Sequence, residues 1–108
     1  MTTSFEYETW LIETGDTVIR KRAQSSGANL SSHEKLIYCV WVADYGMRNA
    51  GDLETARELY PSFQSEACTL ARDLSLQHTL DTFSLSESEL CSQYFDRFEG
   101  VCNELKNA

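Results

Sequence analysis

The stretch Ser31 to Asp52, SSHEKLIYCVWVADYGMRNAGD, contains the longest apolar run of the chain and decides its fold. The run is rich in β-branched and aromatic residues, so its hydrophobicity alone fits a buried strand as well as a helix. The flanking residues favour a helix. Ser31 followed by Glu34 is a capping-box pattern, and Gly51 suits the left-handed turn that ends many helices. We therefore predict a buried central helix over about residues 32–48.

Amphipathic segments on either side of this stretch predict further helices. The first begins after Thr3, and its apolar stripe is Tyr7, Trp10, Leu11, Thr14 and Val18, widened by Phe5, Ile12 and Ile19. We then expect a polar loop at 24–29. After the central helix we expect a short helix at 53–60 with Asp52 as its N-cap, and a longer helix from Phe63. A connection at 77–83 follows, and the last helix runs from Ser86 to about Leu105. The sequence thus predicts an all-α fold. It is a single domain, residues 1–108, with four main helices and one short helix in a compact bundle around the central helix.

The net charge of −8 comes from the two ends of the chain. Residues 1–19 carry four acids and no base, and residues 73–108 carry seven acids and two bases. Phosphate binding needs a basic surface, so we expect no direct nucleic-acid binding. An acidic surface favours a basic partner, or serves solubility alone. Because no apolar run reaches about 18 residues and the N-terminus lacks a signal-peptide pattern, we expect a cytoplasmic protein without membrane contact.

Residues that usually carry chemistry are sparse in this sequence. Neither His33 nor His78 follows a Glu by three residues, as the histidines of di-iron bundles do. His33 is expected to be exposed, and His78 to contact the last carbonyls of the preceding helix. The four cysteines form no C-x-x-C pair and are interpreted as buried apolar residues. We find no phosphate-binding, metalloprotease or hydrolase motif, and expect no catalytic residue, metal site or cofactor.

Two surfaces are candidates for binding. The polar turn after the central helix either forms a recognition surface or only serves the helix–helix connection. The residues of this surface are Asp44, Tyr45, Arg48, Asn49 and Asp52. The acids of the first and last helices would form one negative face if those helices pack side by side. These acids are Glu6, Glu8, Glu13, Asp16, Glu89, Asp96, Glu99 and Glu104.

Two short motifs resemble a bacterial domain-of-unknown-function family that includes a DNA-mimic protein. Tyr38-Cys39-Val40-Trp41, followed by Met47-Arg48-Asn49-Ala50-Gly51, is similar to that family's aromatic-rich helix and Asn-Gly-Gly turn. Gln93 to Phe98, with Glu99 and Glu104 after it, is similar to its acidic, aromatic last helix. The resemblance covers roughly residues 30–105, with Ala50 in place of the usual first Gly and Asp52 where an aromatic often follows. It implies an all-helical fold and an acidic protein-binding role, with no catalytic residue.

Two functions from different classes follow as hypotheses. The first is a small acidic protein that binds a basic protein and is not an enzyme. Its partner is either a nucleic-acid-binding protein, by mimicry of phosphates, or a toxin neutralised by an immunity-type protein. The second is a small-ligand-binding protein or enzyme with a pocket near Tyr38, Trp41, Tyr45 and Arg48. Self-association is a further possibility for either.

Overall fold

The central helix forms where the sequence predicts it. In the computed structural model, which describes residues 4–25 and 30–108, helix α2 spans Ser32–Ala50. At its start the Ser31 hydroxyl accepts a hydrogen bond from the Glu34 N–H (3.1 Å), and the Glu34 carboxylate accepts one from the Ser31 N–H (2.9 Å). At its end Gly51 adopts a φ of 74°, which glycine reaches without steric cost. The predicted capping box and the left-handed conformation of Gly51 are both confirmed, and the helix continues two residues beyond the predicted end at 48.

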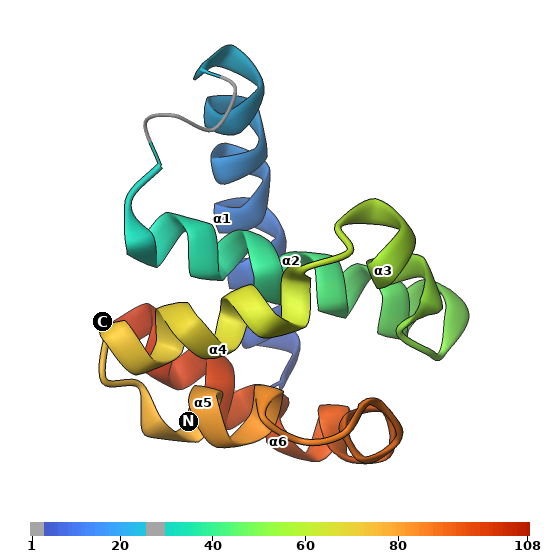
Figure 1. Cartoon of the computed structure of the whole chain (residues 1–108). Coiled ribbons are helices and arrows are strands. Elements are labelled where there is room, and N and C mark those ends of the chain that lie inside the picture. Colours follow the sequence, from blue (N-terminus) through green and yellow to red (C-terminus); the bar gives the residue numbers. More distant parts are fainter. Residues whose placement is uncertain (1–3, 26–29) are drawn as a thin grey trace.

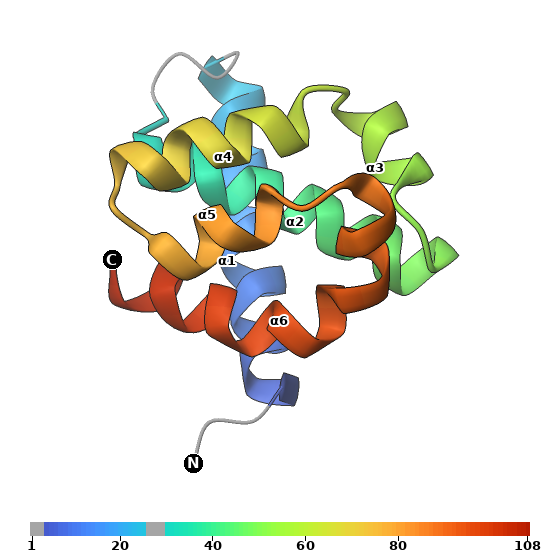
Figure 2. The same cartoon turned by 60° about the horizontal axis from the view of Figure 1, so that its bottom comes forward.

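Five further helices surround α2 within the described residues (Figure 1 and Figure 2). They are α1 (Ser4–Ser25), α3 (Glu54–Leu59), α4 (Phe63–Asp73), α5 (Gln77–Phe83) and α6 (Glu87–Asn107). Helix α2 contacts α1, α3, α4 and α6, while α5 packs between α4 and α6. In both views α1 passes behind α2, and α4 lies on the side of α2 nearer the viewer. The fold is therefore an all-α bundle around a central helix, as predicted.

The core is formed mainly by the inner faces of α2, α4 and α6. On α2, seven apolar residues between Leu36 and Met47 are at most 5% exposed. The buried stripes of the other two helices follow the helical spacing: Phe63, Ala67, Leu70 and Ala71 on α4, and Leu90, Tyr94, Phe98, Val101 and Leu105 on α6. Burying each large apolar side chain stabilises the fold by about 1.5–3 kcal/mol, so these stripes are its main source of stability.

The segment 77–83 is a helix, α5, and the prediction of a plain connection there is wrong. The residue before this helix, Leu76, has no side chain that can cap its N-terminus. The cap comes from Glu104 of α6. The Glu104 carboxylate accepts hydrogen bonds from the N–H groups of His78 (3.0 Å) and Thr79 (2.6 Å) and from the Thr79 hydroxyl (2.7 Å). Two backbone donors that a helix start leaves without intrahelical partners are thereby satisfied.

Three consecutive residues near the end of α6 link it to three other helices. Asn103 accepts a hydrogen bond from the Tyr7 hydroxyl of α1 (3.1 Å). Glu104 caps α5, and the Leu105 carbonyl oxygen lies 2.7 Å from His33 Nε2 of α2. His33 is therefore half-buried against α6, and the expectation that it is exposed is wrong.

Two glycines allow helices to approach closely. A Cβ on Gly100 of α6 would lie 2.3 Å from Nε2 of His78, so the ring of this histidine packs directly on the α6 backbone. The same Nε2 lies 3.2 Å from the Arg97 carbonyl oxygen, which corrects the expectation that His78 contacts the helix before it. A Cβ on Gly15 of α1 would lie 2.5 Å from Cδ1 of Trp41, so α1 and α2 are in contact at this point.

Helix α1 is less covered than its apolar pattern predicts. Tyr7, Leu11 and Val18 are buried, but Phe5 is 75% and Ile12 49% exposed, against expectation. The helix also continues to Ser25, into the predicted polar loop at 24–29. The remainder of that loop, and Thr3, after which the helix is expected to begin, lie outside the described residues.

Candidate functional site

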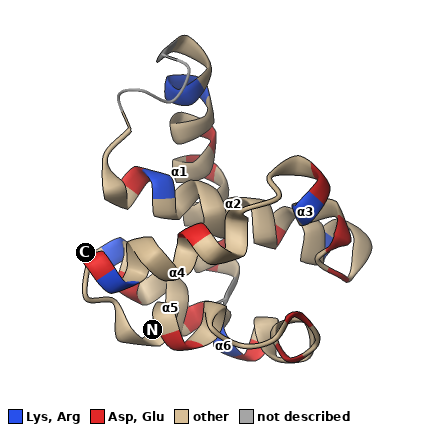
Figure 3. Cartoon of the chain, viewed as in Figure 1, with Lys and Arg blue, Asp and Glu red and all other residues tan. Residues whose placement is uncertain are grey.

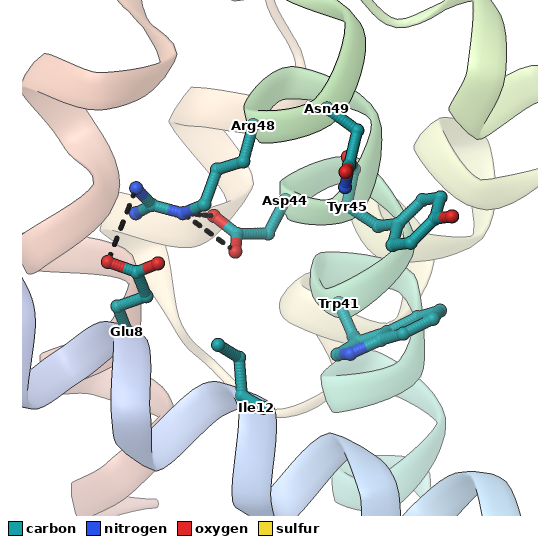
Figure 4. Close-up of a pocket in the computed structure, with 7 residues that line it drawn as sticks. All are labelled: Glu8, Ile12, Trp41, Asp44, Tyr45, Arg48 and Asn49. Carbon is teal, nitrogen blue, oxygen red and sulfur yellow. Dashed lines mark hydrogen bonds and ion pairs between the residues drawn. The ribbon is translucent and has the colours of Figure 1, made fainter.

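A groove lies between α1 and the C-terminal half of α2 (Figure 4). It has a volume of about 190 Å³ and is lined by Glu8 and Ile12 of α1 and by Trp41, Asp44, Tyr45, Arg48 and Asn49 of α2. The α2 residues recur at intervals of three and four, so they share one face of the helix. The groove thus brings together most of the predicted pocket and most of the predicted polar turn.

One wall of the groove is aromatic and aliphatic. The rings of Trp41 and Tyr45 are stacked, with centroids 5.4 Å apart and planes at 26°. Ile12 lies across from them on α1 (Figure 4). Ile12 is 49% and Tyr45 42% exposed, and Trp41 is half-buried. Apolar side chains that are exposed together on a concave surface are more informative about binding than single exposed residues.

The opposite side of the groove is built on a buried carboxylate, Asp44. Its Oδ1 accepts a hydrogen bond from the Tyr94 hydroxyl of α6 (2.7 Å), and Arg48 Nε donates to both of its oxygens at 3.0 Å. Burial raises the pKa of Asp44, while the hydrogen bonds from Tyr94 and Arg48 act in the opposite direction. Burial also raises the pKa of Tyr94, which remains a hydrogen-bond donor. Asp44 therefore joins α2 to α6 and is held in one position.

Arg48 connects this carboxylate to α1 and α6. Its NH1 lies 3.5 Å from Glu8 Oε2, and its guanidinium carbon lies 5.1 and 4.8 Å from the ring centroids of Phe95 and Phe98. The side chains of Arg48 and Glu8 are 28% and 32% exposed. One Glu8 oxygen is directed at Arg48, and the other points toward the groove (Figure 4). Sequence reasoning assigned Arg48 to the polar turn but did not find its partners on α6.

Two predicted site residues lie away from the groove. Asp52 accepts a hydrogen bond from the Glu54 N–H (3.0 Å), so it serves the start of α3. Its prediction as the N-cap is wrong, because the helix begins one residue later than expected and Leu53 is the N-cap. Tyr38, expected in the pocket, packs on the other side of Trp41. Its ring lies 5.2 Å from that of Tyr60, with the Arg22 guanidinium 4.5 Å above it.

Four of the eight acids expected to form one negative face make contacts within the chain. Figure 3 shows acidic residues spread over all six helices. Glu104 caps α5, and Glu89 completes the capping box at the start of α6. Asp16 pairs with Arg20 on α1 at 2.7 Å, and Glu8 pairs with Arg48. Six of the eight are exposed: Glu6, Glu13, Asp16, Glu89, Asp96 and Glu99.

Two of the four cysteines are buried in the core. Cys39 and Cys102 are buried, and burial raises the pKa of Cys39 far above its ordinary value and that of Cys102 to about 12. A thiolate is the reactive form, so these two thiols are unreactive near neutral pH. Across residues 4–25 and 30–108, no His, Cys, Asp and Glu side chains gather in threes as a metal site needs.

Comparisons of this chain with protein families, with characterised proteins and with solved structures found no match. In the part of the chain that the structure describes, no helix combines the length and apolarity needed to cross a membrane. The groove and the charge of the chain are thus the features on which a function can be based.

Proposed function

We propose that the protein acts by binding another protein with a basic surface, without catalysis. The observation that carries this proposal is the groove between α1 and α2. It exposes Ile12, Trp41 and Tyr45 beside the carboxylates of Glu8 and Asp44, in a chain of net charge −8. Aromatic side chains are enriched at protein interfaces, and a negative field steers basic partners toward the surface.

Two classes of basic partner fit this proposal: a nucleic-acid-binding protein and a toxin neutralised by an immunity-type interaction. Mimicry of nucleic acid would be favoured by a row of exposed carboxylates, whereas the acids of this chain are distributed over six helices. This distribution favours a partner held mainly at one local groove. Either partner would present arginine and lysine side chains to it.

The alternative, a small-ligand site or enzyme, is less well supported by the same groove. Small-molecule sites usually have volumes of roughly 300–1,000 Å³, whereas this groove has about 190 Å³. Its most buried polar group, Asp44, already accepts hydrogen bonds from Tyr94 and Arg48. A shallow groove with exposed aromatic walls suits part of a protein surface better.

Affinity capture at two salt concentrations tests the proposal. The immobilised protein is exposed to a cell lysate at about 0.1 M and about 1 M salt, between which the Debye length falls from roughly 10 to 3 Å. We expect the proteins captured at low salt to be more basic than the lysate as a whole and to be released at high salt. The proposal would be contradicted if the same proteins were captured at both salt concentrations, or if the captured proteins were no more basic than the lysate. Self-association of the chain is a competing use of the groove, and size-exclusion chromatography with light scattering would detect it.

A further inference from the structure

We propose that the groove binds an arginine side chain of the partner protein. The guanidinium stacks on the exposed ring of Tyr45, which itself stacks on Trp41, and pairs with the carboxylate of Glu8, and the aliphatic stem packs against Ile12. This inference rests on the proposed function and specifies the group by which the partner is recognised. Its basis is the combination of an exposed aromatic stack with a carboxylate on the facing helix (Figure 4).

The aromatic wall favours a planar cation. A guanidinium stacks on an aromatic face and still directs its N–H groups sideways to a carboxylate, which an ammonium group does less well. Among the described residues, two arginines already lie over aromatic rings. Arg22 lies over Tyr38 at 4.5 Å, and Arg48 lies over Phe98 at 4.8 Å. In the described part of the chain, no guanidinium is found over the stacked pair that faces the groove.

The charges of the groove favour one additional cation. Its lining contains two carboxylates, Glu8 and Asp44, and one cation, Arg48. Arg48 is directed mainly at Asp44, with Nε at 3.0 Å from both oxygens, and approaches Glu8 only to 3.5 Å. Glu8 is also the more exposed of the two carboxylates, with a side-chain exposure of 32% against 5%. A second guanidinium arriving from solvent would therefore pair with Glu8.

Short peptides and two-dimensional NMR of the ¹⁵N-labelled protein test this inference. The probes are hexa-arginine, hexa-lysine and hexa-citrulline, the last of which has nearly the shape of arginine without its charge. The indole N–H of Trp41 reports on the groove, and that of Trp10, outside the groove lining, serves as an internal reference. We expect hexa-arginine to shift the Trp41 signal, hexa-lysine to bind at least three-fold more weakly, and hexa-citrulline to leave the signal unchanged.

Matched variants separate the groove from the general acidity of the chain. Glu8→Gln removes the pairing carboxylate, and Tyr45→Leu removes one ring of the stack while keeping an apolar side chain. Each is expected to weaken hexa-arginine binding about three-fold, the size of one exposed ion pair or one exposed cation–π contact. Glu13→Gln makes the same charge change at an exposed site of α1 outside the groove lining, and should weaken binding less than 1.5-fold, a charge effect screened by salt.

Several results would overturn the assignment of an arginine site. These are hexa-arginine shifts that map to other acids, equal binding of hexa-lysine and hexa-arginine, or equal effects of Glu8→Gln and Glu13→Gln. Circular dichroism checks that each variant is folded. If Tyr45→Leu does not fold, the comparison of Glu8→Gln with Glu13→Gln tests the arginine site by itself. These failures are distinguishable from failure of the proposed function, since salt-dependent capture of basic proteins can persist when the groove is not the binding site.

Discussion

Replacing Glu104 by alanine should destabilise the protein strongly, although this residue lies at the edge of the core. Its carboxylate accepts hydrogen bonds from the N–H groups of His78 and Thr79 and from the Thr79 hydroxyl. Thr79 is fully buried, so water cannot replace the acceptor for its two donors. A buried donor left without an acceptor costs about 1–3 kcal/mol. Allowing for relaxation of α5, we expect a loss of about 3 kcal/mol.

Chemical denaturation followed by circular dichroism measures this loss. A change of about 3 kcal/mol in a domain of this size corresponds to a fall in Tm of more than about 10 °C. Glu104→Gln retains one acceptor oxygen but no charge, and is expected to cost about half as much. Asp96→Ala removes a carboxylate from an exposed site of the same helix and should change the stability by no more than about 0.5 kcal/mol.

A double-mutant cycle with Thr79→Val shows whether the loss arises from the cap. Thr79→Val removes the hydroxyl donor and keeps the backbone N–H, so it should cost about 1 kcal/mol less in the Glu104→Ala background than in the wild type. Equal costs in both backgrounds, or equal destabilisation by Glu104→Ala and Asp96→Ala, would refute the assignment of Glu104 as the cap of α5.

Three further predictions concern the core. Burial raises the pKa of Asp44 in the folded state, so its contribution to stability is fully present below its ordinary pKa of about 3.9 and is lost as the pH rises through the folded pKa. The stability of the wild type relative to Asp44→Asn should therefore fall with increasing pH, as denaturation at several pH values would show. Gly15→Ala should destabilise the fold by about 1–2 kcal/mol. The methyl group would clash with the indole of Trp41, and the cost of this overpacking outweighs the gain in helix propensity of about 1 kcal/mol. Thermal unfolding measures the net change in stability. Alkylation at pH 8 followed by mass spectrometry should modify the two half-buried cysteines first, and Cys39 and Cys102 only after unfolding.

The sequence predicts those helices whose signals are local. The starts of α2 and α6 could be predicted from a local pattern. Each has a Ser and a Glu three residues apart that form a capping box, Ser31 with Glu34 and Ser86 with Glu89. Helix α5 was missed for the opposite reason. Its capping group, Glu104, lies 25 residues further along the chain than Thr79, and no local pattern at Leu76 announces a helix start.

The candidate site was predictable in part. Trp41, Tyr45 and Arg48 share a helical face, so a common surface could be inferred from their spacing alone. The α1 side of the groove could not be inferred in the same way. The apolar spacing of α1 suggested that Ile12 is buried, because periodicity gives the direction of an apolar stripe and not how much of it a neighbouring helix covers.

The links made by Asn103, Glu104 and Leu105 also bear on how the protein is made. These residues hold α1, α5 and α2, yet a ribosome synthesises them after all of those helices. Helix α5 has seven residues, too few for stability on its own, and receives its cap only once residue 104 has left the exit tunnel. We therefore expect the bundle to close only after residues 103–105 have left the ribosome, rather than helix by helix. Until then the apolar faces of α2 and α4 would be available to chaperones.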